Sequence, residues 1–409
     1  MTMVLLCLSG SFIFWLPYFV DTFYIPIQRT FGFSNTQIGV LSGTFGFTSL
    51  LSYAPGGWLA DRYPARKLMS TALLASGMGG FVFAQIPSFE ICLWLYGLWG
   101  VSASLIFWSA MIKATRSWGG QDEQGRAYGF LEGGRSISDA AFGALFLAIF
   151  AWQGANSIAL SSNIKLTSSF LLVMAALVWV TMRDTPVYRP DVHVEGATFS
   201  WDEVRIVLKM PFLWLLTLVI LATNWGMWGT IYLTPYATTV YELGDVWGGA
   251  VGTGKYWLAA FSAVFAGFIA DRIGAARAIV GLFILMTSGF LLFATVPGAA
   301  GLVPMLVLNS ALVVTAVYAL RGIYYALLEQ GHIPMALTGT AVGLVSVIGY
   351  TPDTLAPLVF GFVLDAWPGA MGFQIIFGLI GCICLIGLFA AMLIYRIVQA
   401  PRPDHSSRL

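Results

Sequence analysis

The sequence has little charge. Only 10% of its 409 residues are Asp, Glu, Lys or Arg, whereas 58% are hydrophobic. Soluble domains carry about 25% charged residues, so this chain has too little polar surface to cover a globule in water. Its net charge of +1 excludes the basic surface that nucleic-acid binding requires.

Cysteine and histidine are also scarce. The four cysteines stand in apolar runs and the three histidines in predicted loops or the tail, so neither a disulfide framework nor a metal cluster is expected. The sequence contains no nucleophile–base pair and no cofactor-binding loop. We therefore predict a protein that is not an enzyme and that has no cofactor.

Long apolar runs dominate what remains. A membrane-spanning helix needs about 20 predominantly apolar residues. The first such run has no small-residue cleavage site, so it is interpreted as a span and not as a signal peptide. We predict an all-α membrane protein with twelve transmembrane helices, near residues 4–27, 36–57, 68–87, 91–113, 127–150, 166–182, 211–234, 247–269, 278–297, 302–327, 339–364 and 372–395.

The Lys and Arg residues between these spans are distributed unequally. With a cytoplasmic amino terminus, one side of the membrane holds most of them and the other holds only Arg29 and Lys165. The positive-inside rule then predicts that both termini are cytoplasmic, in a multi-pass protein of a bacterial inner membrane. A charged stretch at 183–210 lies between six spans on each side, which predicts halves at 1–182 and 211–409 joined by a cytoplasmic linker.

Two internal matches indicate a duplication. The segment from Gly57 to Lys67 after the second span resembles the segment from Gly267 to Arg277 after the eighth, about 210 residues later. At a similar offset, the Gly, Ala, Gly and Asp residues in and before the fifth span match those in and before the eleventh (Gly125, Ala127, Gly129 and Asp139 with Gly339, Ala341, Gly343 and Asp353). A six-span unit repeated in parallel accounts for both matches.

The repeated Gly-x-Leu-Ala-Asp-Arg pattern resembles the signature loop of the major facilitator superfamily, and span number and linker agree over the whole chain. The resemblance implies two pseudo-symmetric six-helix bundles and a monomeric secondary transporter of a small molecule in the lipid bilayer. It also implies that the charged residues of the two repeated loops form a cytoplasmic gate. The alternative is that these charges only determine the orientation of the chain in the membrane. Pro64 replaces a usual Gly. The gate residues would be Gly57, Asp61, Arg62, Arg66, Gly267, Asp271, Arg272 and Arg277.

Several charges lie inside predicted spans, where each costs roughly 2.5–3.5 kcal/mol on insertion scales. None lies in spans 3, 6, 9 or 12, which the family fold places toward lipid. The charges are therefore expected to line a central cavity. They are Asp21 in span 1, Glu132, Arg135 and Asp139 in span 5, Lys255 in span 8, Arg321 in span 10 and Asp353 in span 11.

The spacing in span 5 puts Glu132, Arg135 and Asp139 on one helix face. A carboxylate there would exchange a proton while Arg135 binds substrate; the alternative is a permanent ion network. Asp21 is a further candidate for proton coupling or for binding a substrate amine.

In the second half, Arg321 and Lys255 are candidate substrate ligands, or structural partners of Asp353 or another carboxylate. Asp353 follows Pro352, which frees a backbone carbonyl, so we predict a broken helix and a proton-coupling role there. Three aromatic residues, Tyr324, Tyr232 and Trp108, are expected to contact substrate.

The junction of spans 4 and 5 (Trp118 … Glu123-Gln-Gly-Arg126-Ala) is similar to the organic anion and organophosphate side of the superfamily. We predict alternating-access transport of a small organic anion or zwitterion, by proton symport. Two alternatives remain: a proton-coupled exporter of drugs or metabolites, and a non-transporting membrane sensor on the same scaffold.

Overall fold

The computed structural model describes residues 2–119, 124–182, 205, 208–296, 298–331 and 345–399, which form helices joined by short connections, with no strand among them. The N-terminal bundle comprises α1 Thr2–Trp15, α2 Phe19–Phe31, α3 Asn35–Arg62, α4 Ala65–Phe83, α5 Phe89–Gly100, η1 Val101–Trp108, α6 Ser109–Gly119, α7 Gln124–Trp152 and α8 Ser157–Thr181. The C-terminal bundle comprises α10 Pro211–Ile231, α11 Leu233–Thr239, α12 Asp245–Ile273, α13 Ala275–Thr295, η2 Ala300–Leu302, α14 Val303–Ile323, η3 Tyr324–Ala326, α15 Leu327–Gln330, α17 Pro352–Ala366 and α18 Ala370–Gln399.

These helices correspond to the twelve predicted spans. Ten helices or continuous helix runs among the described residues are long and apolar enough to cross a membrane. The other two are α3 and α4, which pack against α17 and α8 respectively. The predicted linker lies, apart from Arg205 and residues 208–210, outside the described residues.

One part of the span prediction was wrong. Lys165 lies within α8 and not in a connection, so the helix of this span begins earlier than predicted. The helix begins nine residues before the predicted apolar run because Asn156 caps it, accepting a hydrogen bond from the Ala159 N–H. Lys165 is exposed, as expected of a long cationic side chain that reaches out of an apolar surface.

Three spans are interrupted rather than straight. Span 1 is divided at residues 16–18, span 7 at Tyr232, and span 11 at residues 350–351. A proline lies at or shortly after each break, namely Pro17, Pro235 and Pro352. Proline lacks a backbone N–H and clashes with the preceding turn, which explains all three interruptions. Only the break at Pro352 was predicted.

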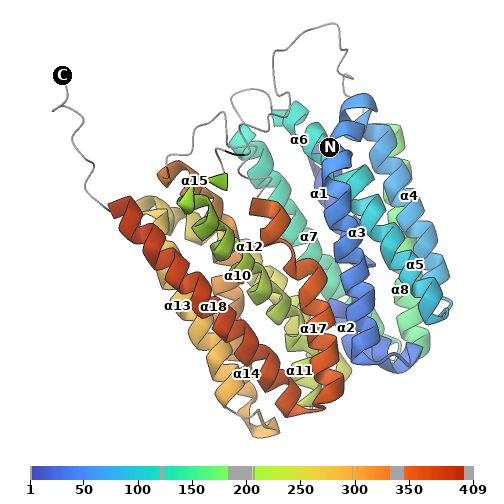
Figure 1. Ribbon diagram of the computed structural model, residues 1–409. Helices are drawn as coiled ribbons and strands as arrows, with labels where there is room; N and C mark the ends of the chain where they lie inside the picture. The colour runs from blue at the N-terminus through green and yellow to red at the C-terminus, as the bar shows by residue number, and fades with distance from the viewer. Residues whose placement is uncertain are drawn as a thin grey trace, which may run out of the picture.

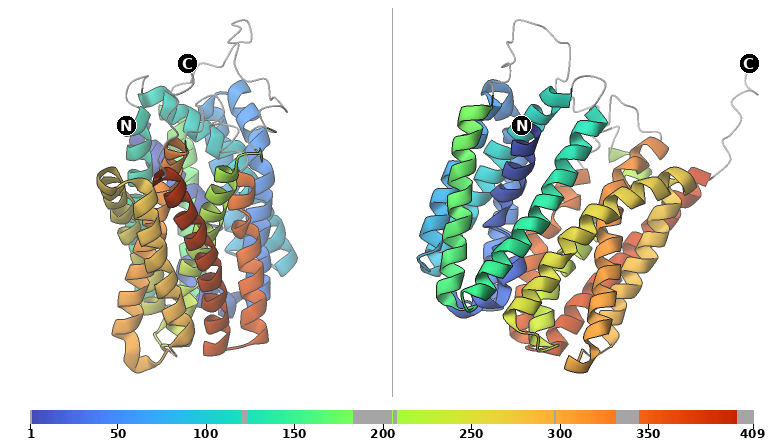
Figure 2. Two further views of the ribbon diagram at one scale, coloured as in Figure 1. Left: turned by 60° about the vertical axis from the view of Figure 1, so that its left-hand side comes forward. Right: turned by 180° about the vertical axis from the view of Figure 1, so that it is seen from behind.

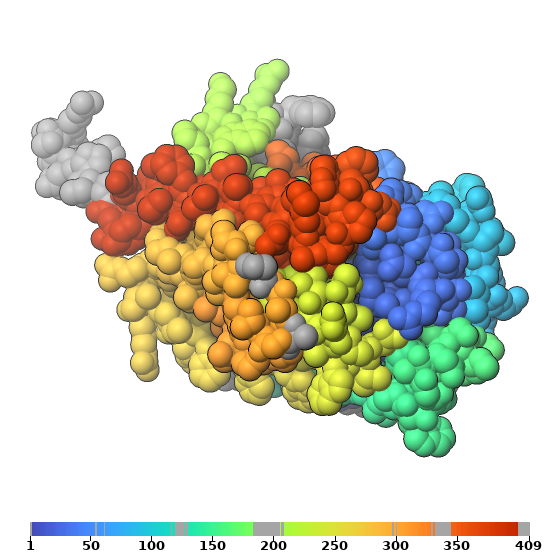
Figure 3. All heavy atoms as spheres, turned by 90° about the horizontal axis from the view of Figure 1, so that it is seen from below, coloured from blue at the N-terminus to red at the C-terminus, as the bar shows by residue number. Residues whose placement is uncertain are grey.

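The two bundles stand side by side (Figure 1). The start of α1 and the ends of α3 and α18 lie at one end, here the terminal face; the α2–α3 connection lies at the opposite end, the distal face. The bundles diverge toward the terminal face (Figure 2), whereas side chains of both meet across the distal face (Figure 3). Cross-bundle packing is mainly between α3 and α17 and between α7 and α12.

Glycines allow the close approach of α3 to α17. A Cβ on Gly39 would collide with the backbone carbonyl of Pro357, and one on Gly43 would come within 2.9 Å of the Thr354 carbonyl. By contrast, Gly57 and Gly267, in the terminal halves of α3 and α12, have open space around them. The bundles are therefore joined in their distal halves and separate in their terminal halves.

Gly39→Ala is expected to destabilise the protein, although Ala is the better helix former. The added methyl group must push α3 away from a backbone atom, and such overpacking costs about 1–3 kcal/mol. The matched control is Gly281→Ala in α13, where nothing lies within 4 Å, so the higher helix propensity of Ala should leave stability equal or raised. Thermal unfolding of the two purified variants measures the difference. Equal melting temperatures would contradict the packing.

Candidate transport site

A buried ion pair joins the two bundles. The Lys255 Nζ of α12 lies 2.5 Å from the Asp21 carboxylate of α2, and the Tyr256 hydroxyl donates to the other carboxylate oxygen at 2.6 Å. Both charged side chains are only 2% exposed. The Asp21 backbone carbonyl accepts a hydrogen bond from Thr234 in α11. Lys255 and Asp21 therefore satisfy each other, and neither is free for substrate in this conformation.

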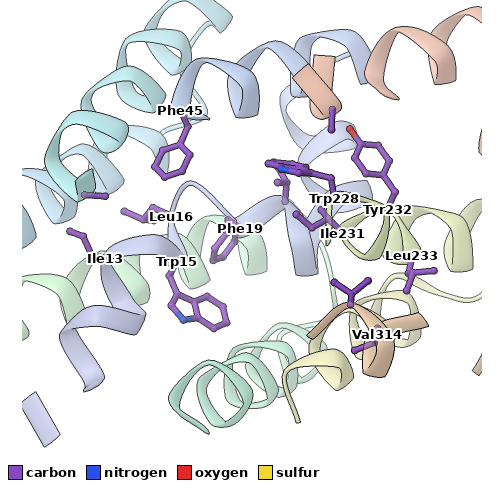
Figure 4. Packing of buried hydrophobic residues seen from close by; sticks show 14 of the residues in the cluster. Ile13, Trp15, Leu16, Phe19, Phe45, Trp228, Ile231, Tyr232, Leu233 and Val314 are labelled. Carbon is purple, nitrogen blue, oxygen red and sulfur yellow. The ribbon is translucent and has the colours of Figure 1, made fainter. Parts of the chain in front are cut away.

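This contact is made where two of the helix breaks meet. Asp21 lies in the first turn of α2, just after the break at Pro17, and its N–H donates a hydrogen bond to the Tyr18 carbonyl. Thr234 stands beside the break in span 7, next to Pro235. Figure 4 shows the apolar packing around this region, with Phe19 from the N-terminal bundle and Trp228, Ile231 and Tyr232 from the C-terminal bundle.

Arg135 forms a second cluster within the N-terminal bundle. Its Nη1 lies 2.9 Å from a Glu132 oxygen, and its Nε donates to the Gly10 carbonyl at 3.1 Å. The guanidinium also lies over the rings of Phe14 and Trp108, 5.7 and 5.1 Å from their centroids. The Glu132 side chain is 61% exposed and that of Arg135 only 15%. Glu132 can therefore leave while Arg135 stays fixed in its aromatic surroundings.

Asp139 shares the helix face of Arg135 but has a different partner. Its carboxylate accepts a hydrogen bond from the Ser11 hydroxyl of α1. No ion pair to Asp139 is found among the described side chains. The Asp139 carboxylate is therefore bound by a neutral donor, the Ser11 hydroxyl.

The third cluster surrounds Arg321 in the C-terminal bundle. Its Nη1 donates to the Asn224 Oδ1 at 2.8 Å and contacts the Met227 sulfur. Among the side chains described, no carboxylate oxygen lies within 4 Å of Arg321. Asp353, at the start of α17, accepts instead from the Trp228 indole N–H at 2.9 Å. Arg321 is thus a cation held in place by neutral groups.

Two tyrosines lie near charged residues of more than one cluster. Tyr53 of α3 is half exposed and lies within electrostatic range of Arg135, Arg321 and Asp353. Tyr318 of α14 lies within range of Asp21, Asp139 and Arg321. Charges of both bundles therefore lie near these two tyrosines.

The predicted aromatic contacts fall into two groups. Trp108 contacts Arg135, and the Tyr324 hydroxyl lies 3.0 Å from that of Tyr350 near Arg321. Tyr232 is as buried as Tyr324, each being 2% exposed, and its ring packs against those of Tyr24 and Phe360.

The gate residues lie at the terminal face. Arg66 reaches Trp179 at the end of α8 (ring centroid 5.2 Å), and Arg277 reaches Tyr395 near the end of α18 (5.8 Å). This equivalence between the bundles matches the predicted repeat. Arg62 lies over the Trp58 ring at 4.0 Å. Asp271 and Arg272 are exposed, whereas the side chain of Asp61 lies outside the described residues.

Sequence reasoning missed the neutral groups that hold the charges, chiefly Asn224, Ser11 and Tyr256. Asn224 had a detectable signal, because an amide in the middle of an apolar span must find a partner. Ser11 and Tyr256 had none, because such residues are common in membrane helices and their partners lie on distant spans.

Fold and site together describe a polytopic transporter with a charged centre. The model of the Major Facilitator Superfamily matches residues 5–352, and the chain belongs to that family. As predicted, this is a family of transporters and not of enzymes.

Relatives and solved structures agree with this assignment. The chain is 28% identical to the inner membrane protein YihN of Escherichia coli, covering 97% of this chain and 95% of the relative. It is 25% identical to the probable nitrate/nitrite transporter NarK2 of Mycobacterium tuberculosis (86% of each chain) and 23% identical to the membrane sensor protein UhpC of E. coli (82% and 79%). A bacterial homologue of the lysosomal transporter Spinster, in an inward-facing and unoccupied conformation, has a similar fold (TM-score 0.76, 14% identity, 98% of each chain).

Breaking the buried pair from one side should be costly. Lys255→Met leaves the Asp21 carboxylate buried without its cation, which is expected to destabilise the fold by about 3–5 kcal/mol. The double variant Asp21→Asn with Lys255→Met removes both charges and should recover part of that loss. The control is Arg29→Gln, which breaks the Arg29–Asp245 pair of the distal face (3.0 Å) from its exposed side, the Arg29 side chain being 68% exposed, and should cost at most about 1 kcal/mol.

Thermal melting in detergent at neutral pH measures all three variants. A double variant as unstable as Lys255→Met alone would show that the two charges do not depend on each other.

Proposed function

We propose that this protein is a proton-coupled symporter of a small organic anion or zwitterion. The observation that carries the proposal is Arg321, a central cation with no carboxylate partner among the described side chains. The other two central cations are paired, Arg135 with Glu132 and Lys255 with Asp21. A carboxylate, phosphate or sulfonate would give the Arg321 guanidinium a charge-assisted hydrogen bond. The similarity to NarK2, whose name assigns it an inorganic anion, supports this class of substrate.

The balance of charge favours proton coupling. The central cations Arg135, Lys255 and Arg321 face four carboxylates, those of Asp21, Glu132, Asp139 and Asp353, so the set carries one net negative charge when all are ionised. Binding an anion adds to that excess, and a proton would offset it. Asp139 and Asp353 are the best carriers because each is bound by a neutral donor. Asp21 is held by Lys255, and Glu132 is too exposed to exclude water.

Alternating access accounts for the arrangement of the bundles. Their tight distal contacts and separate terminal halves fit a state open toward the terminal face, which the positive-inside rule assigns to the cytoplasm. The reverse state would require the distal contacts to part and the gate residues of the repeated loops to engage. We further propose that the halves end near residues 182 and 211, that the protein works as a monomer, and that it resides in a bacterial inner membrane.

One observation favours a second function. The similarity to UhpC, a membrane sensor by name, keeps open a role as a receptor that binds an anion without moving it. Transport and sensing share the Arg321 site, and flux in proteoliposomes separates them. The mixed charges of the centre count against the third candidate, a proton-coupled exporter of drugs or metabolites.

Thermal stability in the presence of candidate solutes tests the proposal. We expect at least one organic or sugar acid to raise the melting temperature, and more at pH 5.5 than at pH 7.5, because ligands that bind only the folded state stabilise it by RT ln(1 + [L]/Kd). Arg321→Ala should abolish the shift and Arg135→Ala should reduce it. The control, Arg29→Ala on the exposed distal pair, should leave it unchanged. Shifts produced only by lipophilic cations would contradict the proposal and favour the exporter.

A further inference from the structure

Asn224 is a completely buried amide in the middle of α10, and both of its polar ends are used. Its Oδ1 accepts from Arg321 at 2.8 Å, and its Nδ2 donates to the Gly349 carbonyl at 2.9 Å. Because guanidinium groups only donate and carbonyls only accept, these partners fix the orientation of the amide. Asn224 therefore connects the unpaired cation of α14 with span 11.

The bond to Gly349 falls at the break in span 11. Residues 345–349 are helical, and α17 begins at Pro352. Between them the Asp353 N–H bonds the Tyr350 carbonyl, and the Thr351 N–H bonds the Ile348 carbonyl, each only three residues back. The regular helical bonding is thus lost here, and the Asn224 amide supplies a hydrogen bond from another helix.

One turn along α10, Trp228 binds the other end of the same break. Its indole N–H donates to an Asp353 carboxylate oxygen at 2.9 Å. Residues four apart on a helix lie on one face, so Asn224 and Trp228 together hold Gly349 and Asp353. Arg321 and Asp353 form no ion pair with each other, and each is hydrogen-bonded to this face of α10.

We propose that Asn224 is a positioning residue that couples anion binding at Arg321 to protonation of Asp353. The inference rests on the proposed function and deepens it. The Arg321 Nη1 has two hydrogens and already contacts both Asn224 and Met227, so an anion that binds this nitrogen in place of Asn224 leaves the amide oxygen without its donor. An unpaired buried amide is unfavourable, so Asn224 must reorient and release Gly349. The break then shifts, the Trp228–Asp353 bond loosens, and an Asp353 carboxylate with fewer donors takes up a proton more readily.

Other groups also act on Asp353. Arg321 in α14, Tyr18 between α1 and α2, Tyr53 in α3 and Tyr324 in η3 lie within its electrostatic range. An anion that neutralises Arg321 would favour protonation through space, even without Asn224. The test must therefore separate the effect of the Asn224 amide on Asp353 from that of the Arg321 charge.

The comparison is between Asn224→Ala and Asn309→Ala. Asn309 is also a buried amide, on α14, and its Nδ2 donates to the Gly289 carbonyl at 2.9 Å, away from the charges. The probe is D-gluconate, a hydroxylated monocarboxylate, with Kd measured at pH 5.5 and pH 7.5. The parent and Asn309→Ala should bind about tenfold more tightly at the lower pH, a typical coupling strength. Asn224→Ala should keep its Kd at pH 7.5 within about threefold but lose the dependence on pH.

Retention of the tenfold ratio in Asn224→Ala would overturn the inference, because the coupling would then act through space alone. If that variant does not fold, Trp228→Phe removes the Asp353 donor, keeps an aromatic ring and should lose the same dependence of Kd on pH.

Hydrogen exchange of the Tyr350 and Thr351 backbone amides gives a readout that needs no anion. Both amides should exchange faster in Asn224→Ala than in Asn309→Ala, and equal rates would also overturn the inference. Failure of the parent to bind gluconate at either pH, with the exchange difference present, would count against the proposed substrate and not against the role of Asn224.

Discussion

The arrangement of this protein depends on one interaction, the buried pair of Asp21 and Lys255. It is made where the broken helices of spans 1 and 7 meet, and it joins the N-terminal bundle to α12 of the C-terminal bundle. Removing one partner of such a pair would leave an uncompensated buried charge, and Tyr256 supplies an additional donor to Asp21. By satisfying each other these two groups leave Arg321 as the unpaired cation among the central side chains described.

The distal contacts and the central site therefore form one system. Gly39 and Gly43 bring α3 against α17, and the first turn of α17 contains Asp353, the carboxylate bound by Trp228. Movement of one bundle against the other must displace α17 and so must disturb the Asp353 environment. Under the proposed function, this shared helix would link proton exchange to the exposure of one face or the other.

Much of this was predictable from the sequence. The twelve apolar windows, the repeat and the interior charges predicted the fold, and the spacing of Glu132 and Arg135 predicted their proximity. The partners of Asp21, Lys255 and Arg321 were not predictable, because pairing between spans depends on how the bundles meet and not on spacing along a helix. Of the helix breaks, only the one with a neighbouring charge was recognised, although Pro17 and Pro235 carried the same signal.

The central claim, that the buried pair holds the bundles together in their distal halves, is tested most directly by a distance across the terminal face. Spin labels on Tyr63→Cys and Ile273→Cys, both exposed at the terminal ends of α3 and α12, with Cys382→Ser to remove the exposed native thiol, report the separation of the bundles in lipid. We predict a single long distance between the labels when the Asp21–Lys255 pair is intact. Adding Asp21→Asn and Lys255→Met should produce a second population with a shorter distance. An unchanged distance distribution in a folded double variant would contradict the account.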